Sequence, residues 1–245
     1  NIQHCTMTTM SESPITAGVI WIGTDDGKVQ VTRTHGAAWV DATAAIASAG
    51  GPADRWVSRV FASSHEAGTA YVAKTGFRND DFRPYLFKTM DYGATWTSIS
   101  AGLPDQPINV VWEDRKNPRV LFVGNDKGVW VTIDGGARWV RMKGDMPNVP
   151  VHDLLVHPRE QDLIVGTYGR AIYITDVSVL QQLTESVLAE DVHVFEIKPR
   201  KPFQASGGEN YDLFGDRYAP TPNEPNAIGI HYYLRDKAER KVSVK

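Results

Sequence analysis

Short apolar stretches alternate with polar turns along most of the chain. One set of four such stretches is Ile108–Trp112, Val120–Gly124, Val129–Thr132 and Trp139–Met142, with Asn125–Gly128 as a hairpin turn. Val, Ile and aromatic residues in short runs bounded by Gly, Asn and Asp are typical of β-strands. Strands that recur about every 9–12 residues without intervening helices exclude a doubly wound parallel sheet and favour a β-sandwich or a β-propeller.

The remaining stretches form three more units of the same kind. The first unit is predicted to contain strands at Cys5–Met10, Val19–Gly23, Val29–Thr32 and Trp39–Asp41, and the second at Val57–Ala62, Ala70–Ala73, Tyr85–Thr89 and Trp96–Ile99. The second unit carries an enlarged loop, Lys74–Pro84. The fourth unit has Val151–Val156, Leu163–Gly166 and Ala171–Thr175, and continues into a helical pattern over Val177–Leu188.

A turn motif occurs once in each of the first three units and is missing from the fourth. The frame Thr-x-Asp-x-Gly-x-x-Trp occurs twice, as Thr89, Asp91, Gly93, Trp96 and as Thr132, Asp134, Gly136, Trp139. A degenerate copy has Thr32, Thr34, Gly36 and Trp39. Because internal repeats of about 40 residues with four strands each are typical of propellers, the motif selects the propeller over the sandwich.

The residue types of this motif predict a structural turn. An Asp carboxylate accepts hydrogen bonds from backbone N–H groups that follow it, and a Thr hydroxyl does the same more weakly. Glycine supplies the positive φ that a tight hairpin requires. The Trp is expected to begin the next strand and to pack back over the turn. We therefore assign these residues to folding rather than to catalysis.

The motif resembles the Asp box, or BNR repeat, of sialidases, two-domain xyloglucanases and the sortilin/Vps10 family. Trp21–Gly27 and Gly166–Arg170 are similar to phrases of the large bacterial BNR/Vps10-type proteins that are often labelled glycosyl hydrolases, although Tyr168 stands where that group usually has His. The resemblance implies an all-β propeller, with the motif between the third and fourth strands of each blade. It also implies a secreted or periplasmic location.

The resemblance and the composition divide the chain into three parts. Residues 1–197 are predicted to form four propeller blades, 198–227 a Pro/Gly-rich linker, and 228–245 the first strands of a further, β-sandwich-like domain. Val192–Ile197 is one more predicted strand, which could complete a blade. Since propellers of this kind usually have six or more blades, we expect the four units to be part of a larger ring, and both ends of the chain to be cut. Open blade edges could then mediate self-association.

Composition and charge narrow the choice of partners. The chain has 26 basic and 29 acidic residues, a net charge of −3, which gives no electrostatic reason to expect a nucleic-acid partner. No apolar run reaches the roughly 20 residues that a membrane helix needs. The one cysteine, Cys5, has no disulfide partner in the chain. His152 and His157 lie on opposite faces of one predicted strand, so no metal site and no cofactor are expected.

Propeller connectivity predicts where a ligand could bind. The turns between second and third strands and the links between blades lie at one end of the blades, and the resemblance implies that ligands bind at that end. The expected catalytic carboxylates are Asp80, Asp81 and Asp126, and the expected substrate-binding residues are Arg78, Arg83, Tyr168, Arg170 and Trp56. The links also place Asp105 at this end.

Three functions remain open from the sequence. A glycoside hydrolase needs two carboxylates about 5–10 Å apart across a cleft. A sialidase would also need three arginines and a tyrosine–glutamate pair, but no glutamate falls at this end of the predicted blades. The leading hypothesis is a glycoside-hydrolase-like propeller that acts on or binds carbohydrate. The alternatives are a Vps10-like propeller that binds a peptide or protein, and a scaffold without catalysis.

Overall fold

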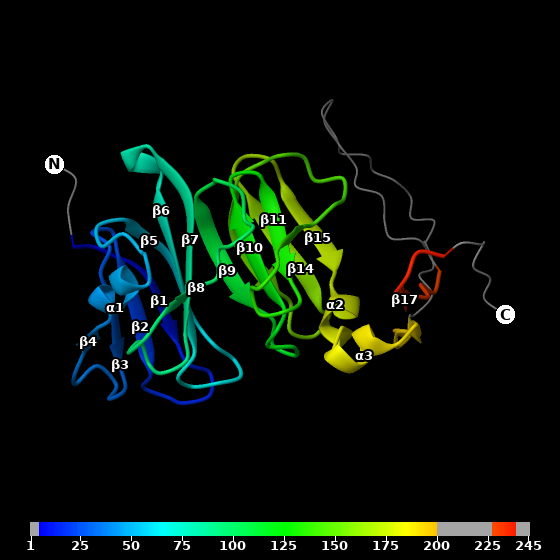
Figure 1. Ribbon diagram of the computed structural model, residues 1–245, viewed down its shortest axis with the longest axis horizontal. Coiled ribbons are helices and arrows are strands. Elements are labelled where there is room, and N and C mark those ends of the chain that lie inside the picture. Colours follow the sequence, from blue (N-terminus) through cyan, green and yellow to red (C-terminus); the bar gives the residue numbers. More distant parts are fainter. Residues whose placement is uncertain (1–4, 200–226, 239–245) are drawn as a thin grey trace, which may run out of the picture. The chain divides into compact units, whose positions relative to one another are not determined.

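The computed structural model describes residues 5–199 and 227–238, and its contacts separate a first unit, residues 1–183, from a second, residues 184–245. In the first unit, antiparallel strands form successive sheets, each made of neighbouring segments of the chain (Figure 1). These sheets are propeller blades, as the sequence predicts.

Three of the sheets have four strands each, in chain order. The first contains β1 (Met7–Glu12), β2 (Ile20–Thr24), β3 (Val29–Thr32) and β4 (Val40–Asp41). The second contains β5 (Trp56–Ala62), β6 (Ala70–Gly76), β7 (Asp81–Thr89) and β8 (Thr97–Ser98). The third contains β9 (Ile108–Glu113), β10 (Leu121–Asn125), β11 (Gly128–Thr132) and β12 (Val140–Arg141).

The fourth sheet has three strands among the described residues, β13 (Val151–Val156), β14 (Asp162–Thr167) and β15 (Ile172–Asp176). The single helix expected after it is two short helices, α2 (Ser178–Gln182) and α3 (Glu185–Ala189), which lie in different units. Val177 and Leu180 pack in the apolar cluster of the third and fourth sheets.

The second unit contains α3 and a small hairpin. β16 (Val192–Val194) pairs with β17 (Tyr232–Leu234) and not with a strand of the fourth sheet. That Val192–Ile197 completes a blade therefore stays a prediction, since its described pairing partner is β17 of the same unit. The greater part of the predicted linker 198–227, and the predicted strand Val242–Lys245, lie outside the described residues.

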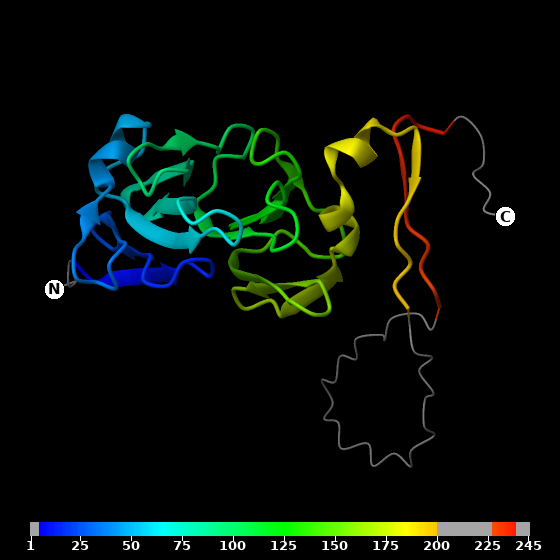
Figure 2. The same cartoon turned by 90° about the horizontal axis from the view of Figure 1, so that it is seen from below.

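The apolar core lies between neighbouring sheets. Trp21, Val29 and Val31 of the first sheet pack against Val60, Val72 and Phe87 of the second. The same arrangement recurs between the second and third sheets and between the third and fourth. The first strands β1, β5, β9 and β13 contact one another in succession, which Figure 2 shows from the end of the strands. Each sheet is thus stabilised by apolar packing against every neighbouring sheet.

The repeated turns have the backbone that the sequence predicts. In each copy two successive residues have positive φ, namely His35–Gly36, Tyr92–Gly93 and Gly135–Gly136. The Thr132 hydroxyl accepts a hydrogen bond from the Gly136 N–H (3.1 Å), and the Asp134 carboxylate accepts one from the Arg138 N–H (2.9 Å). Thr89 with Gly93 and Thr32 with Gly36 repeat the first bond, both at 3.0 Å.

The tryptophans of these turns differ from the expectation in one respect. Two of the three, Trp96 and Trp139, also pack against the preceding sheet, whereas Trp39 of the first sheet is 41% exposed. Trp96 meets Trp21 of the first sheet edge to face, with 5.9 Å between ring centroids. The Nε1–H of Trp139 donates a hydrogen bond to the Ile99 carbonyl of the second blade (2.7 Å). The motif therefore contributes to the joint between neighbouring blades.

Candidate functional site

The enlarged loop of the second sheet is mostly strand. β6 continues to Gly76 and β7 begins at Asp81, so only the 3₁₀ turn Phe77–Asn79 and Asp80 connect them. Gly76 lies opposite Asp81, and a Cβ at this glycine would lie 2.8 Å from the Asp81 Cβ. Asp80 has a left-handed φ of 54°, which Asp tolerates better than most residues. The hairpin is a projecting strand pair with a fixed tip.

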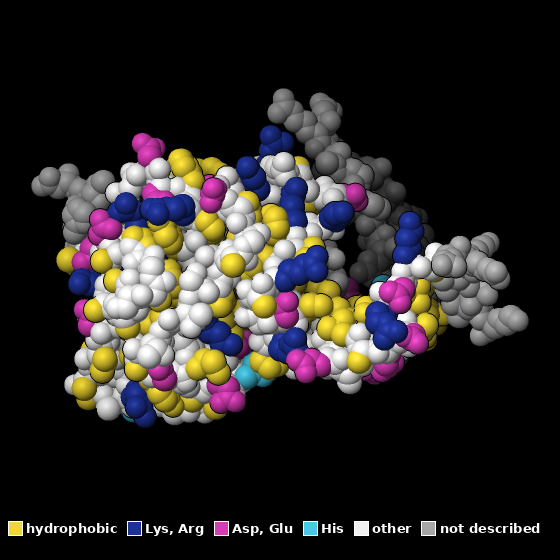
Figure 3. All heavy atoms as spheres, viewed as in Figure 1, with side chains coloured by type: hydrophobic (Ala, Val, Ile, Leu, Met, Phe, Trp, Pro, Cys, Tyr) yellow, Lys and Arg dark blue, Asp and Glu magenta, His cyan; other side chains and the backbone are white. Residues whose placement is uncertain are grey.

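An open pocket of about 680 Å³ lies beside this hairpin. Eight residues line it: Arg55, Asn79, Asp80, Asp81, Phe82, Arg83, Asp105 and Gln106. The hairpin supplies five of them, and the links that precede β5 and β9 supply the others. Basic and acidic side chains lie next to one another over the hairpin on the surface (Figure 3).

Asp81 and Arg83 form the fixed part of the pocket. Arg83 donates from Nε to Oδ1 and from Nη2 to Oδ2 of Asp81, both at 2.9 Å, and the Tyr85 hydroxyl donates to Oδ2 at 2.7 Å. The Arg55 guanidinium lies 3.7 Å from the same oxygen. These hydrogen bonds, above all those from Arg83, hold the pKa of Asp81 well below its usual range. Asp81 is therefore a carboxylate at any physiological pH and cannot serve as a general acid.

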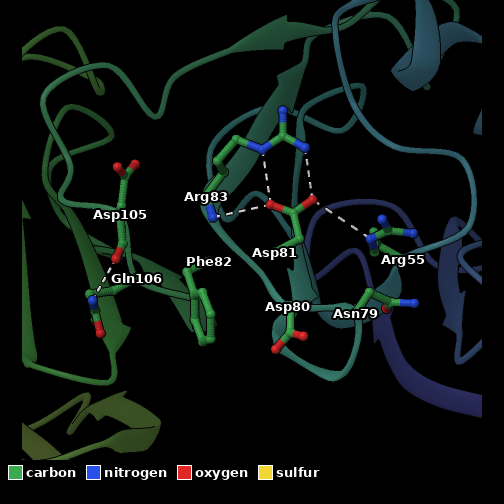
Figure 4. Close-up of a pocket in the computed structure, with 8 residues that line it drawn as sticks. All are labelled: Arg55, Asn79, Asp80, Asp81, Phe82, Arg83, Asp105 and Gln106. Atoms are coloured by element: carbon green, nitrogen blue, oxygen red, sulfur yellow. Dashed lines mark hydrogen bonds and ion pairs between the residues drawn. The ribbon is translucent and has the colours of Figure 1, made fainter.

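The other side chains surround this pair (Figure 4). Phe82 lies between Asp105 and Gln106 on one side and Asn79 and Asp80 on the other. Its ring is 48% exposed, although burying a phenylalanine is favourable. The pocket thus combines an accessible aromatic face with carboxylate and amide groups.

A buried lysine holds the loops at this end of the first two blades together. The Nζ of Lys74 donates hydrogen bonds to the carbonyls of Gly27 (2.9 Å) and Pro52 (2.8 Å). Burial lowers the pKa of Lys74 to about 8. Gly27 itself packs on the link before β5, because a Cβ there would meet the backbone of Ala53 and Arg55. The wall of the pocket that Arg55 forms is therefore rigidly placed.

The structure brings together some of the predicted site residues. Asp80, Asp81 and Arg83 line the pocket. Arg78 instead stacks on the Trp56 ring, 4.2 Å from its centroid. Asp126 lies in the β10–β11 turn, where its Oδ1 accepts a hydrogen bond from Asn109 Nδ2 (2.9 Å).

Tyr168 stacks on His152 of the fourth blade, with 5.3 Å between ring centroids, and Arg170 is exposed in the same β14–β15 turn. Neither of these residues nor Asp126 lines the pocket. The predicted site residues are thus divided between this pocket and the turns of the third and fourth blades.

Asn79 and Phe82 belong to the predicted loop Lys74–Pro84, but two pocket residues, Arg55 and Gln106, lie outside every predicted site segment. Arg55 and Gln106 come from links between blades, where the sequence indicated their neighbours Trp56 and Asp105 instead. The signal that could have found them is connectivity, since each lies within two residues of the start of a first strand.

The arrangement does not assemble a sialidase site among the described residues. A tyrosine–glutamate pair exists, since the Tyr71 hydroxyl donates to Glu113 Oε1 at 2.9 Å. Both side chains are buried between the second and third sheets, about 1% exposed, where no substrate can reach. Arg83 is committed to Asp81, and Arg78 to Trp56, so no three arginines converge.

Two searches of the described residues bear on partners. No group of three or more His, Cys, Asp or Glu side chains there could hold a metal ion. Within the same residues, no helix has the length and apolar character needed to cross a bilayer.

Comparison with known proteins identifies the fold. No protein-family model matches the chain, and no curated protein matches its sequence. Solved structures do match. A GH74 xyloglucanase from Xanthomonas campestris superposes with a TM-score of 0.54 at 14% identity, over 71% of this chain and 30% of that one.

A GH74 enzyme from Niastella koreensis gives a TM-score of 0.55 at 13% identity, over 71% of this chain and 29% of its own. An ancestral GH74 enzyme gives 0.53 at 18% identity, over 73% and 25%. This chain therefore spans less than a third of the length of each of these structures. At such identities the likeness shows the β-propeller fold alone.

Proposed function

We propose that this propeller binds a neutral carbohydrate in the pocket lined by Arg55, Asp81 and Phe82. The observation that carries the proposal is the exposed ring of Phe82 between two sets of polar side chains. The apolar face of a sugar ring can pack on an aromatic side chain. Carboxylate and amide groups on both sides can accept and donate hydrogen bonds to hydroxyl groups.

The charges of the pocket favour a neutral ligand over an anionic one. Its charged side chains are the acids Asp80, Asp81 and Asp105 and the bases Arg55 and Arg83. Both arginines face Asp81, and the acidic side chains of the pocket outnumber its basic ones by three to two. Like charges repel, so a sialic acid or another anionic sugar is disfavoured there. The GH74 likeness supports the same class of ligand, because one matched structure is named a xyloglucanase.

We further propose that the repeated turns are Asp boxes of the BNR type. The support is the shared hydrogen bond from the glycine N–H to the threonine hydroxyl, with paired positive-φ residues, in all three copies. The assignment of these turns carries no catalytic role.

Binding is tested by titration calorimetry with xyloglucan oligosaccharides. Phe82→Ala should weaken binding at least tenfold, which corresponds to about 1.4 kcal/mol. Phe77→Ala is the matched control, because Phe77 is also 48% exposed on the same hairpin but does not line the pocket. Equal losses for both variants, or no binding of any neutral oligosaccharide, would refute the proposal. Binding of a basic peptide library instead would favour the peptide-binding alternative.

Hydrolysis is tested in the same samples by the release of reducing ends. If turnover occurs, Asp80 and Asp105 are the carboxylates to test, because they line the pocket from two different elements and neither is bonded to Arg83 as Asp81 is. Asp80→Asn and Asp105→Asn should then abolish it. Asp126→Asn should leave it intact, because Asp126 does not line the pocket. Loss of turnover in Asp126→Asn would contradict this assignment.

A further inference from the structure

The first strand of every blade carries a β-bulge with a polar residue at the same place. The register shifts between the residues that flank Thr8 in β1, Ser58 in β5, Asn109 in β9 and His152 in β13. A β-bulge re-aims a side chain out of the regular alternation. The four residues are therefore equivalent positions of the repeat.

In the first three blades this side chain donates a hydrogen bond to the next blade. The Thr8 hydroxyl donates to the Val57 carbonyl at 2.8 Å, and the Ser58 hydroxyl to the Ile108 carbonyl at 2.6 Å. Asn109 Nδ2 donates to the Val151 carbonyl at 3.1 Å. The acceptor is always the residue just before the bulge of the next blade. His152 has the donor position but makes no such bond among the described residues.

Apolar packing repeats in the same way. Gly23 lies opposite Val29, Gly124 opposite Val129 and Gly166 opposite Ile172. At Gly23 and Gly124 a Cβ would overlap the side chain of the residue before the next bulge, Val57 and Val151 respectively, with 2.6 Å to a Val151 methyl. These glycines therefore make room for an incoming side chain.

The fourth blade presents this room without an occupant. At Gly166 the nearest atom to a Cβ is the Asp153 carbonyl oxygen of its own sheet, at 3.6 Å. Val29 and Val129 are buried, yet their equivalent Ile172 is 67% exposed, and Ile174 next to it is 64% exposed. We name the surface of Leu155, Gly166, Ile172 and Ile174 the forward face of the fourth blade. No described strand of the first unit covers it.

The first blade has the complementary face, on the side away from the second blade. Met7 stands just before the bulge, where the other blades have Val57, Ile108 and Val151. Met7, Met10 and Trp39 are exposed there. Trp39 is 41% exposed, whereas its equivalents Trp96 and Trp139, which pack on a preceding blade, are 8% and 6% exposed. We name the surface of Met7, Met10 and Trp39 the rear face of the first blade.

We infer that the forward face of the fourth blade binds the rear face of the first blade in a second copy of this chain. The contact continues the interface that the chain already forms three times between its own blades. Met7 would fill the space above Gly166, which suits a flexible side chain, and His152 would donate to the Met7 carbonyl. Two copies joined at both ends supply eight blades, within the roughly four to eight of known propellers.

The oligomeric state tests this inference. Light scattering and sedimentation of the full chain, up to about 100 μM, should give twice the 27.1 kDa chain mass. Ile174→Glu changes the forward face and Met10→Glu the rear face, both at exposed positions. Each variant should be a monomer by light scattering, and its circular dichroism should show that it is folded. Met90→Glu is the control, because Met90 is 70% exposed in the β7–β8 turn and belongs to neither face. That variant should remain dimeric.

Three results would overturn the inference. One is a wild-type chain that is monomeric over the whole range, as expected if residues 184–245 cover the forward face instead. Another is dimerisation that Ile174→Glu abolishes and Met10→Glu leaves intact, which would mean that two forward faces pair.

The third result would come from cysteine cross-linking, which does not depend on how the glutamate variants fold. In a Cys5→Ser background, Gly166→Cys with Met7→Cys should form a disulfide between copies on mild oxidation. Gly166→Cys with Met90→Cys should not. Equal cross-linking of both pairs, or none in the first, would contradict the assigned faces.

Discussion

Replacement of Asp81 by asparagine tests whether the fixed part of the pocket is an ionic anchor of the hairpin. The change keeps the shape of the side chain and removes its charge. One carboxylate oxygen becomes an NH₂ group, which must then face the Arg83 guanidinium or the Tyr85 hydroxyl, both of which are donors. A hydrogen bond to a buried charged group contributes about 1.5–3 kcal/mol, and the Tyr85 hydroxyl is of this kind.

The Arg83 contribution must be discounted. Its side chain is 70% exposed, so water and salt screen most of its attraction to Asp81. The Tyr85 contact therefore predicts that Asp81→Asn lowers the free energy of unfolding by about 1.5–3 kcal/mol. For a chain of this size the melting temperature should fall by roughly 3–12 °C. Urea denaturation at pH 7, followed by tryptophan fluorescence, measures the free energy directly.

The pH dependence gives a second measurement of the same contact. The pKa of Asp81 is lowered in the folded protein, so the folded state binds fewer protons than the unfolded state. Its contribution is fully present above the unfolded value of about 3.9 and is lost as the pH falls below it toward the folded pKa. The difference between wild type and Asp81→Asn should therefore be constant from pH 5 to 7 and narrow below about pH 4.

Asp80→Asn is the control for this experiment. Asp80 adjoins Asp81 in the same hairpin, its carboxylate is exposed, and asparagine tolerates the left-handed φ at this position as well as aspartate does. We expect its stability to stay within about 0.5 kcal/mol of wild type. An equally small effect of Asp81→Asn would refute the reasoning, because Arg83 and Tyr85 would then not depend on the charge.

Three further predictions concern the joints between blades and the repeated turns. Tyr71→Phe should cost about 1.5–3 kcal/mol in urea denaturation, because it removes a buried donor from the Glu113 carboxylate; an unchanged midpoint would mean that Glu113 finds another donor. Gly124→Val should destabilise the fold by about 1–3 kcal/mol, because the new side chain overlaps Val151. Gly166→Val should leave the isolated monomer within about 0.5 kcal/mol of wild type. Equal melting temperatures for the two variants would contradict the different surroundings of these glycines. Thr34→Asp should raise the free energy of unfolding by about 0.5–1 kcal/mol, because an aspartate accepts the Ala38 N–H more strongly than the present hydroxyl does. Asp134→Ala should lower it by about 1–2 kcal/mol, because the Arg138 N–H loses its acceptor. Calorimetric melting measures both variants, and a lower melting temperature for Thr34→Asp would mean that the turns are not equivalent.

The strands of the propeller could be predicted because their local signals agree with the fold. Stretches such as Val120–Gly124 and Val151–Val156 carry β-branched residues between strong turn signals, and the structure places strands there within a residue. The short helix α1 (Thr43–Ser48) was not predicted. Its alanine-rich sequence favours a helix, and it lies in the link between the first and second blades.

The segment Lys74–Pro84 was predicted as an enlarged loop, but most of it is strand. Buried charges argue against strands, yet Lys74 is satisfied by two carbonyls from distant links and Asp81 by Arg83 and Tyr85. Pro84 is tolerated in β7 because it lies where the register with β6 shifts, so no ladder N–H is missing there. These compensations depend on tertiary contacts that local sequence patterns do not contain.

Connectivity predicts at which end of the blades the pocket lies. The residues that line the pocket could be predicted only in part. Asp80, Asp81 and Arg83 follow from the position of one hairpin. Arg55 and Gln106 depend on how the links between blades turn, and the partners of Arg78 and Tyr168 depend on which aromatic ring lies beside each of them. Side-chain pairing across separate loops is the part that the sequence leaves undetermined.

The lengths of the outermost strands bear on the solubility of the protein. β4, β8 and β12 are two residues long each, so the first three sheets offer almost no unpaired backbone to another molecule. The fourth sheet ends instead on β15, a five-residue strand that pairs with β14 alone among the described strands and includes the exposed Ile172 and Ile174. A long apolar edge of this kind is a template for disordered aggregation. Any loss of solubility on concentration should therefore begin at β15, and a lysine introduced at Thr175 should suppress it.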